Sequence, residues 1–158
     1  MTVSTRLANY LTVTQADYDL RPHAPSHTAA ESAHKAHVPE SIVVKSVMLR
    51  DTRTGRYLMA LTPASNRLRL GWVVPEGDEE LVMAREEELV DLFPDCDLGA
   101  VPGFGQAYGL DMIWDDQLGR EQELYFEAGL HDELVRIDHD EFLKLFGSYR
   151  HATISMPH

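Results

Sequence analysis

A single cation interrupts the most apolar stretch of the chain. Residues 41–50 consist largely of Ile, Val, Met and Leu, and Lys45 lies in the middle of them. Such a departure from the local pattern is often found at a functional site. In a partly enclosed cleft the ammonium group could bind a phosphate as a point charge or, if desolvated, act as a base. Alternatively, the side chain reaches the sheet edge and stays solvated while its stem covers apolar surface.

A glycine-rich segment is the second candidate for chemistry. Residues 99–105 read Gly-Ala-Val-Pro-Gly-Phe-Gly. Without side chains in the way, backbone N–H and C=O groups can approach a ligand and bind a carbonyl or an oxyanion. The segment lacks the Gly-x-x-x-x-Gly-Lys-Ser/Thr pattern of a phosphate-binding loop and the Gly-x-Gly-x-x-Gly pattern of a dinucleotide site. A tight surface connection is the alternative interpretation.

Histidines supply the remaining candidates. His131 follows Gly129 in a predicted turn and could titrate near neutral pH, although turn histidines are commonly just exposed. A second group comprises His23, His27, His34 and His37. Their spacing has no matching acidic or cysteine ligands and no His-Glu-x-x-His core, so we expect no zinc site.

The sequence contains no recognisable nucleophile with a positioned base. Cys96 has neighbours that supply no base. Ser26, Ser32 and Ser46 lack the context of a nucleophile elbow. A covalent mechanism based on a classical triad is therefore not expected.

Helices and hairpin-like strand pairs alternate around these residues. The apolar spacing and breaker residues predict helices over 3–12, from Thr28 to near His37, over 81–92 and over 140–146. They predict strands over 17–21, 41–50, 57–62, 110–114, 123–127 and 134–137. This order favours an α+β or mixed α/β domain over a doubly wound parallel sheet.

Length and composition limit the class of protein. The 158 residues, of which 44% are apolar, are sufficient for one domain over residues 1–158 with its own core. One cysteine cannot form an internal disulfide, and neither a signal peptide nor a membrane span is recognisable. We therefore expect a cytoplasmic protein.

Charge is distributed unevenly along the chain. The net charge of −12 combines +4 over residues 1–70 with −16 over residues 71–158. An anionic partner would have to approach the basic part, because phosphate affinity depends on clustered Lys and Arg. The candidate phosphate contacts there are Arg21, Lys35, Arg50, Arg53, Arg67 and Arg69.

Taken together and in this order, the segments resemble the YbaK/prolyl-tRNA synthetase-associated domain family of stand-alone aminoacyl-tRNA deacylases. The resemblance extends from about Ser26 to Phe146. It rests on Thr28-Ala-Ala-Glu31, Val43-Val-Lys45-Ser-Val47, Tyr57-Leu-Met-Ala-Leu-Thr-Pro-Ala64, the glycine-rich segment and Tyr125-Phe-Glu-Ala-Gly129-Leu-His131. It implies a mixed, barrel-like β-sheet flanked by helices.

The resemblance also implies an activity and a site. The family hydrolyses the ester that joins a wrongly attached amino acid to the 3′ end of tRNA, using backbone groups and a ribose hydroxyl of the substrate in place of a metal or a covalent nucleophile. The catalytic residues it implies are Lys45, at the terminal adenosine's phosphate region, Gly99 and His131. The substrate-binding residues it implies are Ser46, Ala100, Val101, Pro102, Gly103, Phe104, Gly105 and Gly129.

Two departures leave the preferred amino acid open. Gly103 stands where many members have a second proline, and Ser46 where others have Thr or Asn. We expect a small amino acid, such as alanine on proline tRNA, because synthetases discriminate poorly against small apolar side chains. Mischarged tRNA is the expected partner, with a synthetase as a second candidate, and no cofactor is expected. The alternatives are a silent module that binds a tRNA end or a nucleotide, and a metal-dependent hydrolase.

Overall fold

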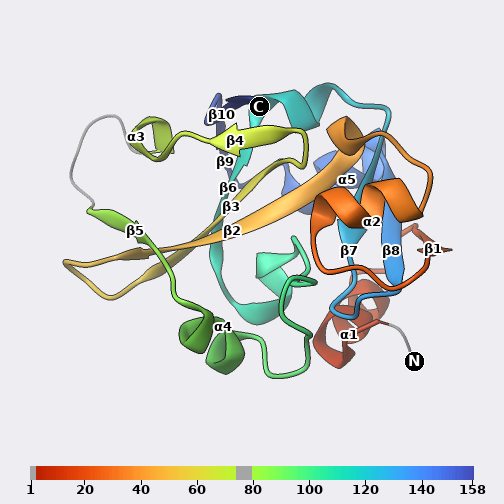
Figure 1. Ribbon diagram of the computed structural model, residues 1–158, viewed down its shortest axis with the longest axis horizontal. Coiled ribbons are helices and arrows are strands. Elements are labelled where there is room, and N and C mark those ends of the chain that lie inside the picture. Colours follow the sequence, from red (N-terminus) through yellow and green to blue (C-terminus); the bar gives the residue numbers. More distant parts are fainter. Residues whose placement is uncertain (1–2, 74–79) are drawn as a thin grey trace.

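A mixed β-sheet is the framework of the computed structural model, which describes residues 3–73 and 80–158 (Figure 1). Its strands are β1 Asp19–Pro22, β2 Val43–Asp51, β3 Tyr57–Pro63, β5 Leu81–Met83, β6 Asp111–Asp115, β7 Glu123–Glu127, β8 Glu133–Asp138 and β9 Arg150–Ala152. The strand order is β1-β8-β7-β2-β3-β6-β9, and β5 pairs with the outer part of β2. Strands β4 Asn66–Leu68 and β10 Ser155–Pro157 form a separate two-stranded sheet.

The mixed sheet confirms the expected fold class, but it does not close into a barrel. Closure would require its two end strands to pair with each other. Within the described residues, β1 pairs with β8 and β9 pairs with β6, and these two end strands do not meet. The sheet is therefore open, and the expected barrel-like form does not extend to a closed barrel.

Helices flank both faces of the sheet. They are α1 Thr5–Val13, α2 Ala29–Lys35, α3 Leu70–Val73, α4 Glu86–Leu92 and α5 His139–Phe146. Short 3-10 helices cover Glu40–Ile42, Gly105–Tyr108 and Asp116–Arg120. Helix α2 begins as predicted, because the Thr28 hydroxyl accepts a hydrogen bond from the Glu31 N–H at 3.1 Å. No helix of residues 3–73 or 80–158 has the length and hydropathy of a membrane span.

The predicted helix over residues 81–92 is wrong in its first part. Residues 81–83 form β5, whose partners on β2 are Leu49, Arg50 and Asp51. The helix begins only at Glu86, where the Arg85 N–H donates to the Glu88 carboxylate at 2.7 Å. The long β2 extends past β7 and offers an unpaired edge there, so tertiary pairing determines the conformation of residues 81–83.

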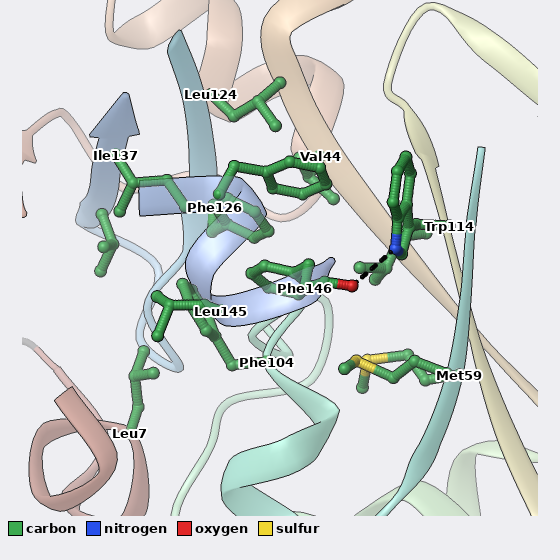
Figure 2. Close-up of a cluster of buried hydrophobic side chains, with 14 of the residues drawn as sticks. Leu7, Val44, Met59, Phe104, Trp114, Leu124, Phe126, Ile137, Leu145 and Phe146 are labelled. Atoms are coloured by element: carbon green, nitrogen blue, oxygen red, sulfur yellow. Dashed lines mark hydrogen bonds between the residues drawn. The ribbon is translucent and has the colours of Figure 1, made fainter. Parts of the chain in front are cut away.

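An aromatic core fills one face of the sheet (Figure 2). Phe126 of β7 packs between Phe104, with ring centroids 4.6 Å apart, and Phe146 of α5, at 5.4 Å. Leu7 brings α1 into the same cluster. The Trp114 indole N–H donates to the Phe146 carbonyl at 3.0 Å, which joins β6 to the end of α5.

Helix α2 covers the other face beside β7 and β8. Ala29 and Ala33 pack against Val43, Tyr125 and Leu134 in a second buried cluster. Small alanine side chains let the helix lie close to the sheet. The start of α2 is thereby held over the place where β2 and β7 lie next to each other.

Candidate active site

The site begins where two parallel strands stop pairing. Strands β2 and β7 pair only at Val43 with Tyr125 and at Val44 with Phe126. Because side chains alternate between the faces of a sheet, the next residues, Lys45 and Glu127, lie on the α2 side of it. Both line the same cavity.

This cavity has a volume of about 230 Å³. Four parts of the chain form its walls: the start of α2, the strands β2 and β7, the glycine-rich loop and α4. Its lining residues are His27, Thr28, Ala29, Lys45, Ser46, Met48, Leu89, Gly99, Val101 and Glu127. The site therefore combines three ionisable side chains, Lys45, Glu127 and His27, with mainly apolar walls.

Lys45 is half-buried at this cavity. Its ammonium group donates to the Asn66 carbonyl at 2.7 Å. Burial lowers the pKa of Lys45 below its usual value, the charge of Arg67 lowers it further, and Glu40 acts in the opposite direction. Because an ammonium group has three N–H donors, two remain for an anion.

The start of the glycine-rich loop forms another wall. Gly99 has a φ of +83°, and a Cβ at this position would overlap the backbone oxygen of His27. The Ser46 hydroxyl donates to the Val101 carbonyl at 3.1 Å and joins the loop to β2. Within the described residues, the N–H groups of Gly99 and Val101 have no hydrogen-bond acceptor. These two N–H groups are therefore available to a bound ligand.

The rest of the loop packs into the protein. Pro102, Gly103, Phe104 and Gly105 are buried and do not line the cavity. Phe104 belongs to the aromatic core, and a Cβ on Gly103 would lie 3.0 Å from the ring of Phe126. These residues hold the loop in place from behind.

Gly129 and Ala100 connect the loop to the end of β7. The Gly129 N–H donates to the Ala100 carbonyl at 2.9 Å, and the Gly129 carbonyl accepts from the Asp97 N–H at 2.7 Å. Gly129 has a φ of +98°, and a Cβ there would lie 2.6 Å from Cβ of Ser4. Only glycine fits this close approach.

His131 lies behind the cavity wall. Its ring makes an edge-to-face contact with His27 at a centroid separation of 5.4 Å. Its Cε1 atom is 3.4 Å from the position that a Cβ on Gly99 would take. His131 thus contacts cavity residues without lining the cavity itself.

The other histidines do not gather around a common centre. Among residues 3–73 and 80–158, no three His, Cys, Asp or Glu side chains are placed to hold a metal ion. Of His23, His27, His34 and His37, only His27 lines the cavity.

The lone thiol is held away from the cavity in a polar cluster. Cys96 Sγ lies 3.1 Å from the Tyr108 hydroxyl, which donates to Asp95 at 2.8 Å. Burial raises the pKa of the Cys96 thiol to about 12.

The structure separates the candidate phosphate contacts. Arg50 forms an ion pair with Glu88 at 2.9 Å, and Arg21 donates to the Ala36 carbonyl at 3.2 Å. Arg67 is exposed, and its charge acts on Lys45. Of these three arginines, Arg67 adds positive charge beside the cavity.

Glu127 is the residue that the sequence analysis missed. It is 3% exposed and lies directly after the apolar run Leu124–Phe126 of β7. Its Oε1 atom accepts a hydrogen bond from the Ser32 hydroxyl at 2.6 Å. One charge at the end of an apolar strand is the same signal that singled out Lys45, and it could have identified Glu127.

The fold and the cavity define a mixed α/β domain with a small site where two strands separate. Comparisons with known proteins give the family and show the same fold in solved structures. The sequence profile of the aminoacyl-tRNA editing domain matches residues 23–145. No curated protein sequence matches the chain significantly. The chain belongs to the aminoacyl-tRNA editing domain family.

Solved structures share the fold. The hypothetical protein APE2540 is 22% identical with a TM-score of 0.83, over 96% of this chain and 99% of that one. A candidate trans-editing enzyme for prolyl tRNA synthetase is 24% identical with a TM-score of 0.77, over 96% of this chain and 95% of that one. A candidate signal transduction protein from Marinobacter aquaeolei is 14% identical with a TM-score of 0.76, over 95% of this chain but 30% of that one.

Proposed function

We propose that the whole chain, residues 1–158, acts as one trans-editing domain that hydrolyses the ester of a mischarged aminoacyl-tRNA. Membership of the editing family supports the reaction class. The observation that carries the proposal is the single cavity that brings Lys45 together with Ser46, Gly99 and Val101. These residues come from two distant parts of the chain, and their meeting gives an anion contact next to a carbonyl-binding loop.

Lys45 supplies the anion contact in this proposal. Its two remaining N–H donors bind the phosphate region of the terminal adenosine, and the exposed Arg67 strengthens the local positive potential. The hydrogen bond to the Asn66 carbonyl fixes the position of the ammonium group. Phosphate binding there would direct the aminoacyl end of the tRNA into the cavity.

The glycine-rich loop stabilises the reacting carbonyl. Water attacks the ester carbonyl carbon, the bond from that carbon to the ribose oxygen breaks, and the released ribose hydroxyl takes a proton from the water. Negative charge develops on the carbonyl oxygen, and the N–H groups of Gly99 and Val101 are available to bind it. His131 acts as a positioning residue through His27 and the Gly99 wall. As the resemblance implies, a ribose hydroxyl of the substrate helps to activate the water.

The size of the cavity favours a small amino acid. About 230 Å³ is less than the roughly 300–1,000 Å³ of pockets that enclose drug-sized ligands, so an aminoacyl group fits better than a whole nucleotide. Ala29, Met48 and Leu89 provide apolar walls for a short side chain. We therefore propose alanine on proline tRNA as the first substrate to test, and a similar fold in a candidate trans-editing enzyme for prolyl tRNA synthetase is in keeping with this choice.

The test is release of labelled amino acid from a panel of mischarged tRNAs, with and without a chelator. Lys45→Ala should reduce deacylation roughly 10- to 150-fold, because a hydrogen bond to a charged group contributes about 1.5–3 kcal/mol. Lys144→Ala is the matched control, since Lys144 lies on α5 and pairs with Glu141 at 3.2 Å. Equal rates for the wild type and Lys45→Ala would remove the lysine from the mechanism. Binding of tRNA without hydrolysis of any substrate would favour the silent binding module.

A further inference from the structure

One carboxylate oxygen in the site has no partner. Glu127 Oε1 accepts the Ser32 hydroxyl, and within the described residues Oε2 makes no hydrogen bond although it is buried. Behind Ser32 the polar chain continues to Ser26 at 2.7 Å and from Ser26 to the His131 carbonyl at 3.4 Å. This chain fixes one side of the carboxyl group and leaves the other side unsatisfied.

An ionised carboxylate that is buried with one oxygen unpaired is unfavourable in free energy. Burial raises the pKa of Glu127 to about 7, and the hydrogen bond from Ser32 opposes this effect only in part. A cation placed against the free oxygen would reduce the cost, because paired buried charges are far less unfavourable than isolated ones.

No described residue forms a hydrogen bond with this oxygen, so none places a cation against it. The other ionisable groups that line the cavity are Lys45 and His27. Lys45 donates to Asn66, and its pKa is shifted by burial, Arg67 and Glu40. His27 makes its ring contact with His131. Within the described residues, the buried Oε2 of Glu127 is therefore left without a hydrogen-bond partner, and Glu127 lines the cavity in which a ligand would bind.

We propose that Glu127 binds the α-ammonium group of the aminoacyl ester and so selects substrates with a free amino group. This proposal rests on the proposed editing function. The terminal torsion of a glutamate is soft, so the carboxylate can turn Oε2 toward the cavity while Oε1 remains near Ser32. An α-amino group has a pKa of about 7.7–8.0, so it is mostly protonated at neutral pH.

The two charges would orient the substrate from both ends. Lys45 holds the phosphate region, Glu127 holds the ammonium group, and the N–H of Gly99 is available to the carbonyl between them. Fixed orientation of this kind contributes strongly to rate in sites that have no strong acid or base at the reacting atom. Aminoacyl-tRNA with a blocked amino group, such as a formylated or peptidyl form, would be rejected.

The test uses adenosine carrying alanine in a non-hydrolysable 3′-amide bond, compared with its N-acetyl counterpart. The wild type should bind the free amine at least about tenfold more tightly. In Glu127→Gln, which keeps the shape and loses the charge, this preference should fall below about twofold. Glu123→Gln is the matched control, because Glu123 lies on the same strand but pairs with Arg136 at 2.8 Å.

The outcomes separate this inference from the proposed function. An unchanged preference in Glu127→Gln, or no preference in the wild type, overturns the inference even if mischarged tRNA is hydrolysed. A wild-type preference that Glu127→Gln abolishes supports the inference even if no tRNA is hydrolysed, in which case the deacylase function fails. Parallel rates on alanyl-tRNA and N-acetylalanyl-tRNA should show the same loss of selectivity in Glu127→Gln.

Discussion

The buried carboxyl group of Glu127 predicts a distinct dependence of stability on pH. Its pKa is about 7 in the folded protein and 4.5 in the absence of burial. Between these values the folded state keeps a proton that the unfolded state has lost, so the free energy of unfolding decreases as pH rises and levels off above about 7. With 1.36 kcal/mol for each pKa unit, this decrease amounts to about 3 kcal/mol. Glu127→Gln removes the titration.

Urea unfolding of the wild type and Glu127→Gln from pH 4.5 to 8.5 measures this contribution, because titrations common to both proteins cancel in the difference. The variant should match the wild type near pH 4.5 and be more stable by about 3 kcal/mol above pH 7. Glu123→Gln should behave oppositely. The hydrogen bond from Arg136 lowers the pKa of Glu123, so this variant loses stability at neutral pH and the loss shrinks as pH falls. A difference between Glu127→Gln and the wild type that stays constant with pH would refute the reasoning.

Two further predictions use the loop and the thiol. Gly99→Ala and Gly109→Ala form a matched pair with φ values of +83° and +68°, but a Cβ overlaps a backbone oxygen only at Gly99 of the two. Both variants should lose about 1–2 kcal/mol of unfolding free energy, because alanine disfavours a left-handed backbone. Gly99→Ala should lose a further ~1–3 kcal/mol from the overlap, and its deacylation activity with it. Equal urea midpoints for the two variants would contradict the packing argument. The Cys96 thiol, with its pKa of about 12, should react with iodoacetamide at pH 8 at least about a hundredfold more slowly than in the urea-unfolded chain. Similar rates in both states would show that burial does not protect it.

Local sequence patterns predicted most of the large elements. The hairpin of β2 and β3 and strand β7 lie within two residues of their predicted bounds, because apolar runs and a turn mark their ends. Short elements were not predictable in this way. Strands β4, β9 and β10 have three residues each and carry no periodicity, and their existence depends on pairing with distant residues. Strand β5 was not predicted for the same reason, since it also has three residues.

The candidate site was predicted in part. Lys45 and Gly99 line the cavity, and their signals were local: a cation in an apolar run and a cluster of glycines. Phe104 stands beside those glycines in the sequence but packs into the core. The position of a residue along a loop does not tell whether its side chain points toward the cavity or into the core. Glu127 and His27 enter the cavity through the pairing of β7 with β2 and the docking of α2. The charge that ends the apolar run of β7 marks Glu127 in the sequence, but the meeting of these two residues depends on contacts between distant segments.

The same alternation that builds the core also creates the site. Val44 and Phe126 point into the aromatic cluster, so their successors, Lys45 and Glu127, must lie on the opposite face, where the pairing of the two strands has ended. Two partly or fully desolvated charges reduce the stability of the unbound protein. A ligand that carries both an anion and an ammonium group would recover that free energy, and the stabilisation would grow with its concentration as RT ln(1 + [L]/Kd). The binding free energy would then come as much from pairing charges that are desolvated in the unbound site as from new contacts. A substrate with a blocked amino group would lack the contribution of Glu127.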